Sequence, residues 1–65
     1  MTNDQITFRK YLLHIFVDQR HDIISSLVWI SNHYYRLPYH FQSAYRALSV
    51  DERNAVIREV LMNGD

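Results

Sequence analysis

The stretch FRKYLLHIFV, residues 8–17, decides the fold class of this chain. Its apolar side chains recur three and four residues apart, which is the spacing of one face of an α-helix. A second apolar row runs beside the first, so the helix is apolar around more of its circumference than an ordinary surface helix requires. The main stripe is Phe8, Tyr11, Leu12, Ile15 and Phe16.

Polar residues mark the two ends of this helix. Thr2 and Gln5 have the three-residue spacing of a capping box, in which each side chain bonds the backbone N–H of the other. Asp4 suits the positive end of the helix dipole. The polar segment DQRHD, residues 18–22, interrupts the pattern. We therefore predict a first helix from about Asp4 to Asp18.

Two further helices follow the polar segment. Asp22 is a preferred capping residue, so we predict a second helix from about Asp22 to Tyr35. Pro38 forces a boundary, because the residue before a proline avoids the α region and proline itself suits the first turn of a helix. We expect the third helix to run from about Pro38 to Leu48.

The segment SVDE, residues 49–52, is the clearest local signal and predicts the start of a fourth helix. Asn63-Gly64 is a typical stop. With a single glycine and a single proline in 65 residues, we predict one domain, residues 1–65, built as an all-α compact bundle of three to four short helices. The side chains expected to face inward are Ile23, Ile24, Leu27, Val28, Ile30, Tyr34 and Tyr35 on the second helix, Phe41, Ala44, Tyr45 and Leu48 on the third, and Val50, Val56, Ile57, Val60 and Leu61 on the fourth.

The size of the chain favours self-association. A domain this short buries only about 60% of its unfolded surface, and the sequence has no cysteine for a disulfide. The second apolar row of the first helix, Ile6, Leu13 and Val17, has spacing suited to a helix–helix seam. It could pack against the fourth helix within one chain or form a two-fold dimer. We predict a homodimer through these three residues.

The candidate binding surface lies in residues 23–50, which contain no acidic residue and most of the aromatic side chains. Aromatic rings interleaved with arginine and histidine are typical of binding hot spots. Burial of the Trp29 ring by a neighbouring helix is the alternative for that residue. Two helix faces carry this mixture: Trp29, His33 and Arg36 on the second helix, and Tyr39, Gln42, Ser43 and Arg46 on the third.

Nothing in the sequence indicates catalysis or metal binding. His14, His21, His33 and His40 show no zinc-binding spacing, and the serines lie in helical or capping positions rather than in a nucleophile elbow. The lone glycine leaves no phosphate-binding loop. We expect no enzyme activity, no catalytic residue, no metal and no cofactor.

We therefore predict a small cytoplasmic regulatory or adaptor protein that binds and occludes a larger protein partner, as an inhibitor does. Zero formal charge provides no global field for nucleic acid. The alternative is a DNA-binding transcription regulator that reads base edges with the third helix. A purely structural subunit of a larger assembly is a third possibility. The apolar runs are too short to span a membrane.

Overall fold

The computed structural model describes residues 1–64, which form four α-helices, one 3-10 helix and no strand. The predicted all-α class is confirmed. No helix in this part of the chain is long and apolar enough to cross a bilayer. The elements are α1, Asn3–Asp18; α2, Ile23–Asn32; η1, Tyr34–Arg36; α3, Tyr39–Ala47; and α4, Val50–Asn63.

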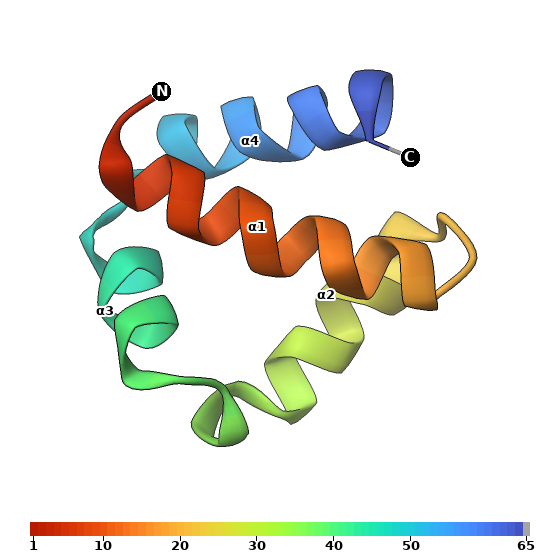
Figure 1. The fold of residues 1–65 in the computed structure, drawn as a ribbon, viewed down its shortest axis with the longest axis horizontal. Helices are drawn as coiled ribbons and strands as arrows, with labels where there is room; N and C mark the ends of the chain where they lie inside the picture. Colours follow the sequence, from red (N-terminus) through yellow and green to blue (C-terminus); the bar gives the residue numbers. More distant parts are fainter. Residues whose placement is uncertain (65) are drawn as a thin grey trace.

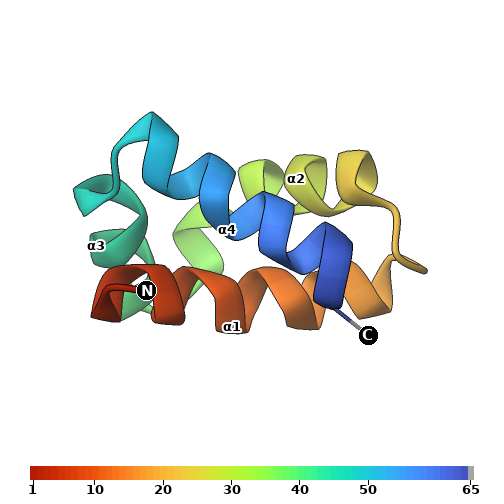
Figure 2. The same ribbon diagram turned by 90° about the horizontal axis from the view of Figure 1, so that it is seen from above.

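Helix α1 is the centre of the arrangement, because each of the other three α-helices packs on it. In Figure 1, α4 lies above α1 and α2 lies below it. Figure 2 shows that α2 and α4 lie on the same side of α1, while α3 covers its N-terminal half at one end. Helices α2 and α4 therefore pack mainly against α1.

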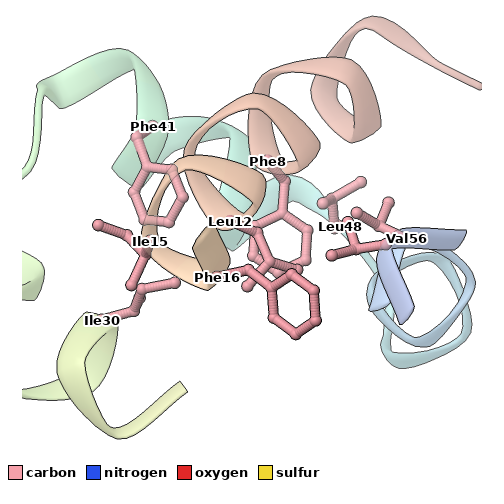
Figure 3. Packing of buried hydrophobic residues seen from close by; sticks show 9 residues of the cluster. Phe8, Leu12, Ile15, Phe16, Ile30, Phe41, Leu48 and Val56 are labelled. Carbon is pink, nitrogen blue, oxygen red and sulfur yellow. The ribbon is translucent and has the colours of Figure 1, made fainter. Parts of the chain in front are cut away.

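The core is assembled around the predicted stripe of α1. Side chains from α1 point toward α2, α3 and α4 in turn (Figure 3). The Phe41 ring of α3 lies 6.1 Å from the Phe8 ring and 5.4 Å from the Tyr11 ring. The predicted inward faces of α1 and α3 are confirmed. The buried apolar cluster is Phe8, Leu12, Ile15, Phe16, Ile30, Phe41, Leu48, Val56 and Val60.

Capping residues begin three of the helices as predicted. Thr2 Oγ1 accepts from the backbone N–H of Gln5 at 3.2 Å, and Ser49 Oγ accepts from that of Glu52 at 3.2 Å; both capping boxes are complete. Asp22 caps α2 by accepting from the backbone N–H of Ser25 at 3.1 Å. That hydrogen bond lowers the pKa of the Asp22 carboxyl, because it stabilises the charged form.

Polar contacts fasten α4 along α1. The Gln5 amide donates to the main-chain carbonyl of Glu52 at 3.3 Å. One turn further along, the Arg9 guanidinium makes a forked ion pair with Glu59, whose Oε1 accepts from Arg9 Nη2 at 3.1 Å. The hydrogen bonds to Glu59 raise the pKa of Arg9. These contacts fix the register of α4 on α1.

Helix α1 ends in a Schellman motif whose left-handed position is filled by Arg20. The N–H of Arg20 donates to the Val17 carbonyl at 3.1 Å, and that of His21 donates to the Phe16 carbonyl at 2.8 Å. The His21 ring stacks on the Phe16 ring, 5.0 Å between centroids. Arg20 has φ 59° and His21 has φ 63°, a region that costs a side-chain-bearing residue free energy.

Replacing Arg20 by glycine should stabilise the protein. The left-handed conformation costs Arg20 about 1–2 kcal/mol, and glycine removes that cost. Glycine also raises the conformational entropy of the unfolded chain, which lowers stability by roughly 0.4–1 kcal/mol. We therefore expect the free energy of unfolding to rise by about 0.5–1 kcal/mol. Urea unfolding followed by circular dichroism measures it. The control is Arg58→Gly within α4, which should lose about 1 kcal/mol. Equal losses in both variants would contradict the motif.

Helix α2 differs from its prediction in length. It ends at Asn32 instead of continuing to Tyr35. Leu37, which precedes Pro38, has φ −76° and ψ 153°, the extended conformation that proline imposes. The chain reaches that conformation through the 3-10 turn η1, so the α-helical spacing does not extend past His33.

Helix α2 is also rotated relative to its prediction. Its buried residues are Ser26 and Ile30, with Ile23 half-buried beside them. Ser26 is fully buried because its hydroxyl donates to the Asp22 carbonyl at 2.6 Å, which leaves no polar atom unpaired. The inward placement predicted for Ile24, Leu27, Val28 and Tyr35 was wrong, since all four are exposed.

Helix α4 buries a narrower face than its prediction. Val56 and Val60 are fully buried, and Ile57 is half-buried against the core. Val50 and Leu61 were predicted to face inward, but both are exposed. With the half-buried Ile57 they form an apolar row along α4, at intervals of seven and four residues.

Candidate partner-binding surface

The first predicted binding face is only partly formed. The Trp29 side chain is half-buried against the core, and its ring stacks on the His33 ring, 4.1 Å between centroids. His33 Nδ1 lies 2.8 Å from the Trp29 carbonyl. Because α2 ends at Asn32, Arg36 is in η1 and not one helical turn beyond His33. Trp29 and His33 are brought together, whereas Arg36 belongs to another element.

The second predicted face is formed on α3. Tyr39, Ser43 and Arg46 are exposed along it. Gln42 is half-buried instead, and its amide donates to the Leu37 carbonyl at 2.9 Å. Its main-chain carbonyl accepts from the Tyr34 hydroxyl at 3.2 Å. The Gln42 side chain therefore fastens α3 to the preceding turn, and reading a base edge would require it to give up that bond.

The predicted dimer seam on α1 is divided. Ile6 and Val17 are exposed, whereas Leu13 is half-buried and packs against the core. Leu13 lies beside the end of α4: a Cβ on Gly64 would be 2.9 Å from Leu13 Cδ1. Leu13 thus packs within the chain, as the alternative held, and dimerisation through this seam stays a prediction.

The four histidines lie in separate surroundings. His14 lies 3.6 Å from the Asp18 carboxylate, and His40 Nε2 is 2.8 Å from the Tyr11 hydroxyl. His21 and His33 stack on the Phe16 and Trp29 rings. In residues 1–64 no three histidine or carboxylate side chains gather where they could hold a metal ion.

A groove that the sequence did not predict lies between α2 and α4. Its volume is about 520 Å³. Figure 2 shows both helices on the same side of α1, which supplies the floor through Phe8. The lining is Phe8 from α1, Leu27, Ile30 and Ser31 from α2, Tyr34 and Tyr35 from η1, Tyr45 from α3, and Val50, Arg53, Asn54 and Ile57 from α4.

Aliphatic and aromatic side chains dominate this groove, and none of its lining residues is acidic. At one rim Val50 is 67% exposed, and at the other Tyr35 projects from η1 with most of its surface free. The Tyr34 and Tyr45 rings pack edge to face, 5.7 Å between centroids, which holds the aromatic end of the groove in place.

Arg53 is the one charged residue of the lining. Its guanidinium lies over the Tyr45 ring, 4.1 Å from the ring centroid. Its Nε and Nη2 donate to the Tyr45 carbonyl at 3.2 and 2.9 Å. Among residues 1–64 no carboxylate lies within 4.0 Å of it. The positive charge is therefore held in place without a neutralising partner in the described chain.

The exposed apolar face of α2 adjoins the groove. Ile24 is 73% exposed and Val28 is 53% exposed, and both lie next to Leu27 on the surface of α2. A shallower hollow of about 330 Å³ lies on the far flank, lined in part by Val28, Trp29 and His33. Large contiguous apolar surface on a monomer is typical of a contact site.

Searches with this chain matched no family model, no curated protein and no solved structure. The site is therefore interpreted from its own residues. Sequence patterning assigned Ile24, Leu27, Val28 and Tyr35 to the core, so it did not predict the exposed surface that they form. The sequence did not indicate which side of α2 packs against the core.

Proposed function

We propose that this domain is a non-enzymatic regulatory or adaptor module that binds a larger protein and occludes the surface it covers. The contact surface is the groove between α2 and α4 together with the tyrosines of η1. The observation that supports this most directly is the apolar side of α2, which is left exposed beside a concave, aromatic-lined groove.

The chemistry of the lining favours a protein as the partner. Tyrosine and arginine are enriched at the centres of protein interfaces, and they are combined here with the branched side chains Leu27, Ile30 and Ile57. Apolar walls supply binding free energy only to a partner that also buries apolar surface. DNA binding through α3 stays a prediction of the sequence, and the arrangement of Gln42 does not favour it.

Substitution of the groove rim provides the test. Val50→Asp places a carboxylate in the first turn of α4, where the helix dipole favours it, so the fold should be retained. We expect it to reduce capture of the partner from a lysate of the native host at least tenfold. The control is Met62→Asp, because Met62 is also an exposed apolar residue of α4 but lies outside the groove and outside the predicted dimer seam.

The same pull-down is divided into nuclease-treated and untreated halves and analysed by mass spectrometry. Circular dichroism confirms that both variants are folded. A dominant protein that survives nuclease and is lost only with Val50→Asp is the expected result. Equal capture by the two variants, or protein recovery that depends on intact nucleic acid, would rule the proposal out.

A further inference from the structure

We propose that the segment bound in the groove is an amphipathic α-helix of the partner protein, with one carboxylate placed against Arg53. This inference rests on the proposed function, because it specifies the partner segment for the same groove. It combines three observations: the shape of the groove, the absence of an exposed strand edge in residues 1–64, and the fixed positive charge of Arg53, which has no carboxylate of residues 1–64 within 4.0 Å.

The dimensions of the groove match two turns of a helix. Its α4 wall extends from Val50 to Ile57, which corresponds to about 10 Å of helix axis at roughly 1.5 Å per residue. Apolar anchors at i, i+4 and i+7 of a bound helix cover the same distance. Aliphatic residues on both walls, such as Leu27 and Ile57, suit the side chains that such anchors provide.

An extended segment is a poorer fit. Binding of a strand depends on main-chain hydrogen bonds to an exposed sheet edge. Residues 1–64 contain no strand, and the N–H and C=O groups in the interiors of α2 and α4 are paired within their own helices. The walls therefore present side chains rather than backbone, and a partner whose backbone is internally paired loses nothing by docking there.

The state of Arg53 specifies the charge of the partner. Its two hydrogen bonds to the Tyr45 carbonyl and its stacking on the Tyr45 ring fix the guanidinium before binding. The remaining N–H donors are free to bind a carboxylate, and little side-chain entropy is lost because the group is preorganised. A partner without a carboxylate would cover this charge without compensation.

The same charge disfavours a second copy of this chain as the occupant. A two-fold interface brings the same patch of both subunits together. Both copies of Arg53 would then enter one apolar interface whose lining contains no acidic residue. A partner helix with an acidic side chain avoids that penalty, so charge complementarity selects it over self-association.

The test is selection from a phage-displayed library of helix-forming peptides of about sixteen residues. A peptide of about this length is helical in isolation once it is stapled. The bait is the full chain. We expect enriched sequences to have apolar residues at i, i+4 and i+7 and one Asp or Glu at a fixed position. The best sequence is then synthesised as a stapled peptide and as its carboxylate-to-amide analogue.

A double-mutant cycle links that carboxylate to Arg53. We expect the amide analogue to bind the wild type about five- to tenfold more weakly, and to bind Arg53→Gln as well as the acidic peptide does. Arg58→Gln, an exposed cation outside the groove, should leave the difference unchanged. Circular dichroism checks the fold of each variant, and amide shifts of Ser31 and Asn54 locate the bound peptide.

Several results would overturn the inference. They are no enrichment, enriched sequences rich in proline, binding outside the groove, or the same loss from the amide analogue in the wild type and Arg53→Gln. A wild-type dimer in sedimentation that Val50→Asp dissociates would assign the groove to a second copy. A different result would contradict the proposed function, namely capture of the host partner that Val50→Asp leaves unchanged.

Discussion

Replacing Phe41 by alanine should lower the free energy of unfolding by about 3–5 kcal/mol. Phe41 is fully buried, and its ring contacts aromatic neighbours from α1, η1 and α3. A chain of this length has a total stability of about 3–10 kcal/mol. Phe41→Ala should therefore remove a large share of that stability, and urea unfolding followed by helical circular dichroism measures the loss.

A change on the exposed side of the same helix is the control. Tyr39 is 75% exposed at the start of α3, and Tyr39→Ala should change stability by less than about 0.5 kcal/mol. Similar losses in Phe41→Ala and Tyr39→Ala would show that α3 does not pack through Phe41. The pair separates the loss of a core ring from the loss of an aromatic residue.

The starts of α1, α2 and α4 could be predicted because the signals are local. Thr2 with Gln5, Asp22, and Ser49 with Glu52 act through hydrogen bonds that span three residues, so no knowledge of the tertiary structure is needed. The core face of α1 was equally clear, because α1 packs against three other helices and nearly every apolar position of its main stripe is used.

The rotation of α2 could not be predicted because it depends on a buried polar residue. The apolar residues between Ile23 and Val28 lie on several sides of α2, and hydropathy predicts that the most apolar side is buried. In the structure Ser26 faces the core instead, since bonding to the Asp22 carbonyl removes the cost of burying its hydroxyl. The groove escaped prediction for the same reason, because Leu27 had been assigned to the core.

The aromatic side chains of residues 23–50 fall into two structural groups. Phe41 is buried, and Tyr34 and Tyr45 pack against the core, whereas Tyr35 and Tyr39 remain on the surface. Composition does not separate these groups, since all five lie in one acid-poor stretch. The separation requires the turn at η1, which presents Tyr34 and Tyr35 to different surroundings.

The orientation of α2 gives the second large effect. Ile30→Ala should lower the free energy of unfolding by about 2–4 kcal/mol, because Ile30 is buried between α2 and α1. Ile24→Ala should cost less than about 0.5 kcal/mol, because the Ile24 side chain is largely exposed. Both changes replace isoleucine by alanine within one helix, so differences in helix propensity nearly cancel. Urea unfolding of the two variants measures the contrast.

This pair decides between the two faces that α2 could bury. A loss from Ile24→Ala as large as that from Ile30→Ala would mean that α2 buries the wider face predicted from hydropathy, which includes both residues, and the groove would then lose its Leu27 wall. Unfolding at several protein concentrations adds a further distinction, since a cost at Ile24 that grows with concentration arises between chains. If the cost at Ile24 stays small at every concentration, the apolar face of α2 is free in the isolated protein, which leaves it available to a partner.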